Sequence, residues 1–119
     1  MAMSEPEGHW LVRPDLGEDR VLATLEIATS RRARRRGLLG RDSLDGALVL
    51  RPARSVHTFG MRFAIDVAHL DGEGRVLRIA TMKPNRLGAF VRRSRSVIET
   101  EAGAFARWGV GKNDLLEIR

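Results

Sequence analysis

The sequence predicts a mainly β protein, α+β by strict count, in which about seven short strands form a compact twisted or barrel-like sheet with two short helices. Three observations predict this class. Apolar and polar residues alternate along several short segments, the period of a half-buried strand. Turn residues separate these segments. The 119 residues, 43% hydrophobic and 30% charged, also have the balance of one globular domain with its own core.

The N-terminal part of the chain predicts two strands. His9–Arg13 is a possible short strand before the turn Pro14–Gly17, and Val21–Ala28 alternates as a half-buried strand does. We therefore expect residues 1–20 to form a tail with a possible edge strand, and residues 21–119 to form a single β-barrel-like domain. Closure into a barrel would leave no strand edge exposed.

A short basic helix is expected over Ser30–Arg36, with Thr29 as its N-cap and Gly37 as its terminator. Arginines cover most of its circumference, and Ala33 with Gly37 forms its only stripe of small residues. Such a helix has almost no apolar surface to bury. Its neighbours must therefore hold it in place, and we expect it to cap one opening of the sheet.

The middle of the chain contains the strongest strand pattern. Ala47–Leu50 is a short apolar strand that ends before Pro52, and Met61–Leu70 is a longer strand with two unlike faces. One face is expected to point inward and carries Met61, Phe63, Ile65, Val67 and His69. The other is expected to line a hollow or meet a partner and carries Arg62, Ala64, Asp66, Ala68 and Leu70.

The C-terminal part predicts a hairpin, two more strands and a second helix. Asp71–Gly74 is a hairpin turn, and Arg75–Thr81 is its return strand. Ser96–Thr100 is extended, Glu101–Trp108 fits a short helix, and Asp114–Ile118 closes the chain as a strand.

Positive charge is concentrated in two segments of the chain. The formal net charge is +6, and among the 21 basic residues only Lys83 and Lys112 are lysines. The window 31–41 holds six arginines and no acid, and the window 86–95 holds four more arginines, also without an acid. The remainder of the chain is therefore net negative, and the basicity is local.

Several segments together resemble a known family. They are Arg34–Arg41, which runs Arg-Arg-Arg-Gly-Leu-Leu-Gly-Arg; Ser55–Val67, with Ser-Val-His-Thr-Phe-Gly-Met-Arg-Phe-Ala-Ile-Asp-Val; the hairpin Asp71–Leu77; and the closing segments 97–103 and 109–116. In this order they resemble the family called domain of unknown function 192, over about Leu25 to Ile118.

The resemblance implies a small β-barrel-like fold. It implies no catalytic residue, because the family has no established activity. This sequence departs from the family pattern at Ala64, where members often have proline, and at Asn85, where an aromatic residue is common.

Polar side chains converge around the start of the strongest strand. Arg62 and Asp66 lie four residues apart on one predicted face, with the small Ala64 between them. They form either a salt bridge that ties the strand to a loop or the lining of a polar pocket. His57 is either a structural residue or part of that same pocket.

If a pocket is present, its chemistry suits an anion. Arg62 would hold a carboxylate or phosphate with two hydrogen bonds, His57 would exchange a proton, and Asp66 would orient one of them. Arg36 and Arg41 would reach the same opening if the helix caps it. The predicted ligand-binding residues are Arg36, Arg41, His57, Thr58, Met61, Arg62 and Asp66.

Four function classes follow from these residues. The preferred one is a binding module for an anionic small molecule or a peptide carboxylate. A nucleic-acid-associated or regulatory protein is the first alternative, using Arg31, Arg32, Arg34, Arg35 and Arg36 on phosphates, although the same run is also typical of a solvated basic face. The others are an enzyme with His57 and Asp66 as an acid–base pair, and a structural or assembly role.

Several chemistries find no motif here. The absence of cysteine excludes disulfides and thiol nucleophiles, and the three histidines lack metal-ligand spacing. No phosphate-binding or dinucleotide motif is present, so we expect neither a metal nor another cofactor. No apolar run reaches the roughly 20 residues of a membrane span, and Met1–Gly8 is polar. We therefore expect a cytoplasmic protein.

Overall fold

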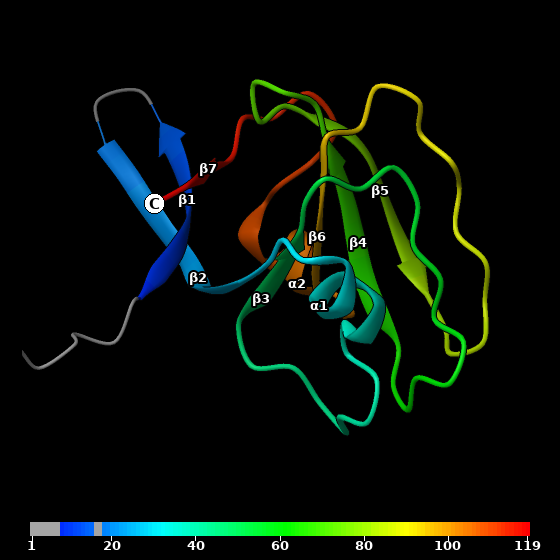
Figure 1. The fold of residues 1–119 in the computed structure, drawn as a ribbon. Coiled ribbons are helices and arrows are strands. Elements are labelled where there is room, and N and C mark those ends of the chain that lie inside the picture. Colours follow the sequence, from blue (N-terminus) through cyan, green and yellow to red (C-terminus); the bar gives the residue numbers. More distant parts are fainter. Residues whose placement is uncertain (1–7, 16–17) are drawn as a thin grey trace, which may run out of the picture.

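One twisted sheet organises the chain (Figure 1). The structure, a computed structural model, describes residues 8–15 and 18–119. In these residues the strands are β1 (His9–Asp15), β2 (Glu18–Ala28), β3 (Ala47–Leu50), β4 (Ile65–Leu70), β5 (Val76–Met82), β6 (Ser96–Glu101) and β7 (Glu117–Ile118). The helices are α1 (Arg31–Arg36) and α2 (Ala104–Trp108). The predicted mainly β class, with short strands and two short helices, is confirmed.

The sheet is open. Its strand order is β5-β4-β6-β3-β2-β1-β7, so β5 and β7 form its two edges and the sheet is twisted without closing into a barrel. The segments that lead into these two edge strands are joined by an isolated bridge between Arg75 and Leu115 and by backbone hydrogen bonds, such as the one from the Val76 N–H to the Asp114 carbonyl at 2.9 Å. All neighbouring strands are antiparallel except β2 and β3, which are parallel. The connection between that parallel pair carries α1.

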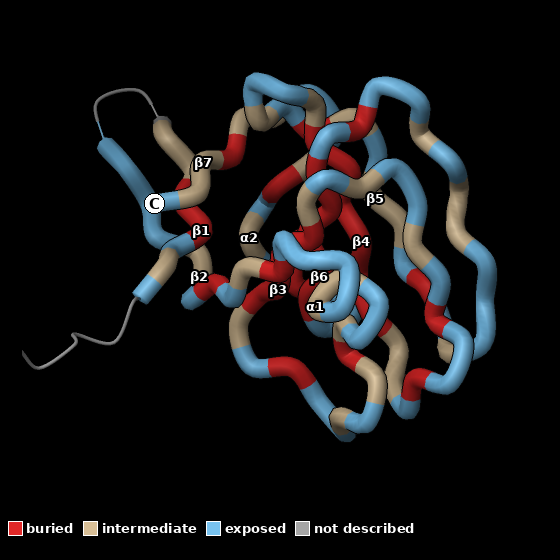
Figure 2. The backbone as a smooth tube through the Cα atoms, in the orientation of Figure 1, coloured by how far each residue is buried: buried red, intermediate tan, exposed pale blue. Residues whose placement is uncertain are grey.

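Both faces of the central strands are covered. All six residues of β4 are buried, and Figure 2 shows buried residues concentrated along β3, β6 and β4. Successive side chains point to opposite faces, so the strands contribute to two separate cores. The α2-side core contains Leu11, Leu25, Ala47, Val49, Ala68, Leu70, Val76, Ile98, Phe105, Val110 and Leu116. The α1-side core contains Ala28, Leu38, Leu44, Leu48, Leu50, Met61, Ile65, Val67, Met82 and Val97.

The predicted two-faced strand over Met61–Leu70 is wrong in its first half. The strand begins at Ile65, because Gly60 has a φ of +78° and the Met61 N–H donates to the Thr58 carbonyl at 3.1 Å, which turns the chain there. In the second row of β4, Asp66 lines a cavity of about 700 Å³ on the α2 side of the sheet. Ala68 and Leu70 pack in the α2-side core instead.

Two further local predictions change. Ser30, rather than Thr29, is the N-cap of α1, and its hydroxyl accepts the Ala33 N–H at 3.0 Å. β1 is not an edge strand, because it is paired with β2 on one side and with β7 on the other. The division of the chain at residue 20 stays a prediction. No helix in the part of the chain that the structure describes is long and apolar enough to cross a membrane.

Candidate functional site

A cavity of about 310 Å³ lies between α1 and the sheet. Its wall comes from α1 and the residues after it, from the end of β3, from the segment that follows β3, and from β6. The charged and polar lining residues are Arg31, Arg34, Arg35, Arg36, Ser55, His57 and Glu99. The apolar part of the lining includes Leu38, Leu39, Leu50, Val56 and Met61. The cavity therefore combines a basic roof with a partly apolar floor that contains one acid.

Glu99 is that acid, and its position is unusual for a charged residue. It lies in β6 two residues after Val97, so it faces the α1 side of the sheet, and it is only 3% exposed. Burial raises the pKa of its carboxyl to about 7. No hydrogen bond or ion pair joins the carboxyl to any other described residue. A buried acid without a protein partner is available to a ligand.

The arginines of α1 divide into one structural residue and three available ones. The Arg34 guanidinium donates to the Pro52 carbonyl at 2.7 Å, which ties α1 to the segment after β3. This bond helps to hold a helix that has no buried residue of its own. The side chains of Arg31, Arg35 and Arg36 make no hydrogen bond or ion pair with described residues. These three guanidinium groups can therefore donate to an anion in the cavity.

His57 is positioned by its own loop. Its Nδ1 accepts the Phe59 N–H at 3.2 Å, and its ring stacks on Phe59 with 5.0 Å between the ring centres. Because Nδ1 is used as an acceptor, Nε2 carries the proton of the neutral ring and is the free donor. Met61 is buried and contributes an apolar surface to the same cavity.

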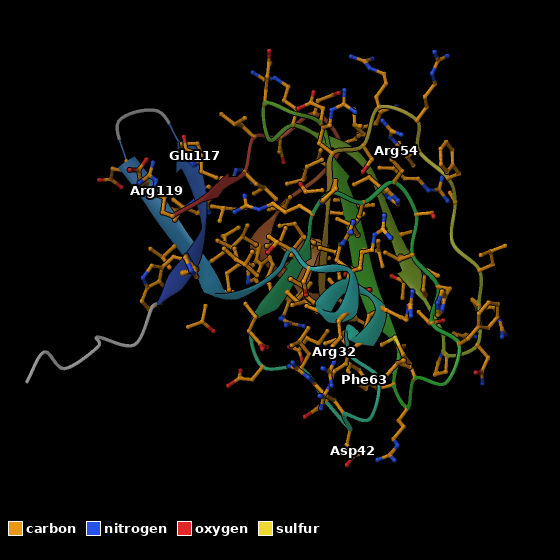
Figure 3. All side chains as sticks on the ribbon, viewed as in Figure 1. Arg32, Asp42, Arg54, Phe63, Glu117 and Arg119 are labelled. Atoms are coloured by element: carbon orange, nitrogen blue, oxygen red, sulfur yellow. The ribbon has the colours of Figure 1, made fainter. Side chains whose placement is uncertain are left out.

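Three other predicted ligand-binding residues do not line this cavity. Arg41 pairs with Glu26 at 2.7 Å, and the hydrogen bond from Arg41 lowers the Glu26 pKa. Arg62 pairs with Asp42 at 2.9 Å, and Figure 3 shows Asp42 beyond α1, away from the sheet. Thr58 is fully buried, and its hydroxyl donates to the Lys83 carbonyl at 2.6 Å. Thr58 thus joins two loops.

Asp66 lies on the other side of the sheet. Its two carboxylate oxygens accept from the Thr81 hydroxyl at 2.6 Å and from the Gly103 N–H at 3.0 Å. It shares the face of β4 that carries Ala68 and Leu70, while His57 lines the α1-side cavity. The predicted row of Arg62 with Asp66 and the predicted acid–base pair of His57 with Asp66 are therefore both wrong. Because β4 begins only at Ile65, the alternation that would place Arg62 on the same face as Asp66 does not reach Arg62.

The family model of domain of unknown function 192 (DUF192), described as an uncharacterized ACR, matches residues 14–118. This chain belongs to the DUF192 family. No curated protein matches the chain.

Two solved structures are similar to this DUF192 chain in fold. One is a protein of unknown function from Novosphingobium aromaticivorans, with a TM-score of 0.78 and 18% identity over 91% of this chain and 83% of that one. The other is a "putative transcription regulator" from Sinorhizobium meliloti, with a TM-score of 0.75 and 21% identity over 98% of this chain and 97% of that one. At such low identity the likeness supports the fold alone.

Three of the segments that carry the DUF192 resemblance meet at the α1-side cavity. Residues 34–39, residues 55–57 with Met61, and Glu99 all line it, although they are far apart in the sequence. Glu99 is the charged lining residue that sequence reasoning did not select. The sequence does contain a sign of it. Glu99 follows Val97 and Ile98 within a strand whose residues are expected to be buried, and an acid is unusual at such a position.

Proposed function

We propose that this DUF192 domain is a binding module for a small anionic molecule, held in the cavity between α1 and β6. The observation that carries this proposal is the composition of the cavity: four arginines and one histidine line it together with a buried acid that has no partner among the described residues. The cavity volume of about 310 Å³ is at the lower end of the range for small-ligand pockets. A compact ligand is therefore favoured.

The two ends of the cavity suit different parts of such a ligand. Arg31, Arg35 and Arg36 would donate charge-assisted hydrogen bonds to its carboxylate or phosphate. Glu99, when protonated, would donate to a carbonyl or hydroxyl oxygen at the ligand's other end. Ionised Glu99 would instead repel an anion. Since the Glu99 pKa is about 7, we expect tighter binding below that pH than above it.

A thermal-shift screen tests the proposal. Anionic metabolites, free carboxyl-terminal peptides and the same peptides with amidated ends are compared at low salt, because a bound ligand raises the melting temperature. Affinity for a hit is then measured for Arg35→Gln, Arg36→Gln and Arg32→Gln. Arg32 lies on the same helix but does not line the cavity, so it is a matched control.

The expected result is about tenfold or greater weakening for Arg35→Gln or Arg36→Gln, the effect of losing a charge-assisted hydrogen bond, with Arg32→Gln unchanged. A preference for free over amidated peptides would identify a peptide carboxylate as the ligand. No stabilisation by any anion, or equal weakening in all three variants, would reject the cavity as the site.

Nucleic-acid binding is the second candidate. Arg31, Arg32, Arg35 and Arg36 are exposed and have no acidic partner among the described residues, whereas Arg41 and Arg62 are paired with acids. The similar Sinorhizobium meliloti protein carries the name of a transcription regulator. If four phosphates are contacted, the logarithm of affinity should fall against the logarithm of salt with a slope of about −3 to −4. Here Arg32→Gln should matter as much as Arg35→Gln, which separates the two candidates. A cytoplasmic location also stays a prediction.

A further inference from the structure

His69 is a buried imidazole without a hydrogen-bond partner. It lies in β4 and is 2% exposed, and neither Nδ1 nor Nε2 has a partner in the described part of the chain. Its pKa is lowered, first by burial and then by the positive charge of Arg78, while the backbone of Ala89 opposes the shift without completing a hydrogen bond. Leaving such a group unsatisfied costs free energy, so it calls for an explanation.

A second cavity, of about 360 Å³, adjoins this ring. It lies between β4 and β5 on one side and the segment 83–89 on the other. That segment is fastened to residues of the loop before β4: the Gly88 N–H donates to the Val56 carbonyl at 2.9 Å, and the Arg86 N–H to the Thr58 hydroxyl at 2.9 Å. The cavity shares no lining residue with the cavity beneath α1.

The charges that face this second cavity are all positive. Arg78 comes from β5, and Lys83 and Arg86 come from the covering segment, while no aspartate or glutamate lines it. None of these three cations forms an ion pair with a described carboxylate. The remaining wall is largely apolar and includes Val67, Ala80, Met82, Leu87 and Ala89.

We propose that this cavity is a second binding site, independent of the site beneath α1, for a small carboxylate with a compact apolar body. The carboxylate meets Lys83 and Arg86 and accepts the N–H of His69, and the apolar body packs on Val67 and Met82. The ring nitrogens are enclosed, so binding includes a turn of the imidazole toward the cavity about its soft χ2 torsion. The ligand thereby supplies the hydrogen bond that His69 lacks.

Nuclear magnetic resonance of the imidazole nitrogens tests the proposal on the full chain. The protein has only three histidines, and Gln variants of His9 and His57 assign the His69 signals. The protein is titrated at neutral pH with benzoate, which has both a carboxylate and an apolar body, and separately with inorganic phosphate. The expected result is a saturable shift of the His69 nitrogens with benzoate and a weaker response to phosphate.

The two lysines of the chain supply a matched pair of variants. Lys83→Gln should weaken the benzoate response of His69 about tenfold, whereas Lys112→Gln, outside this cavity, should leave it unchanged. Unmoved His69 signals at high millimolar benzoate would overturn the site. A response to phosphate that equals the response to benzoate would overturn the carboxylate assignment. Equal effects of Lys83→Gln and Lys112→Gln would show that benzoate is attracted by the net positive charge of the protein, and would overturn the site. The signals of His57 report the α1-side cavity separately in the same spectra.

Discussion

Replacing Glu99 by glutamine tests whether its carboxyl is as buried and as unpartnered as described. A carboxyl whose pKa is raised to about 7 in the folded chain from the ordinary 4.5 binds more protons when folded than when unfolded between these two pH values. Its contribution to stability is therefore full below about pH 4.5 and is lost as the pH rises to about 7. At roughly 1.4 kcal/mol for each pH unit, the loss is about 3 kcal/mol.

Glutamine has the same shape and cannot ionise, so Glu99→Gln should avoid this loss. We expect the variant to match the parent near pH 4.5 and to be more stable by up to about 3 kcal/mol at pH 8. Urea unfolding followed by tryptophan fluorescence, repeated across this pH range, measures the difference directly. Glu73→Gln is the control, because Glu73 is exposed in the hairpin after β4. Parallel pH curves for parent and Glu99→Gln, or a variant less stable at pH 8, would refute the reasoning and indicate that an arginine neutralises the ionised acid.

Two further predictions concern residues whose roles differ from the sequence expectation or depend on backbone geometry. Asp66→Ala should lower the free energy of unfolding by about 2–4 kcal/mol, because two donors lose a buried carboxylate; Arg62→Ala should cost no more than about 1 kcal/mol, because its ion pair is exposed. Comparable losses in urea unfolding would contradict this assignment. Gly46→Ala should be clearly more destabilising than Gly40→Ala: both glycines have positive φ, but only at Gly46 would the new Cβ meet the Thr24 carbonyl oxygen, at 2.7 Å. Equal melting temperatures for these two variants would show that backbone strain alone sets the effect.

Much of the fold could be predicted from periodicity and turn chemistry. The strand over Val21–Ala28, the apolar run Ala47–Leu50 and the terminating Gly37 all correspond to observed features, because each depends on local residue pattern. The start of β4 could not be predicted in this way. Residues 61–64 alternate as a strand would, but the hydrogen bond of Met61 to Thr58 turns them, and that turn is supported by the distant loop at residues 83–86. Tertiary contacts override the local pattern there.

The candidate site was only partly accessible to the same reasoning. Arg36, His57 and Met61 do line one cavity, as proposed from the helix and the signature segment, together with Arg31, Arg34 and Arg35 from the alternative set. Glu99 is a candidate site residue because it lines the same cavity as the arginines of α1. A sequence pattern does not show which distant residues share a cavity. Arg41 and Arg62 were indistinguishable in sequence from the free arginines. Only the positions of Glu26 and Asp42 in space identify their partners.

Because β2 and β3 are parallel, the framework of the sheet and the wall of the α1-side cavity depend on different residues. Parallel neighbours need a connection that returns along the sheet, and here residues 29–46 make that return and supply the roof of the α1-side cavity. If the cavity binds a ligand as proposed, changes in the length or charge of this connection would alter which ligand it accepts, while the hydrogen bonds between strands stay in place. Under the proposed function, this connection would set the binding preference, and the paired strands would set the framework.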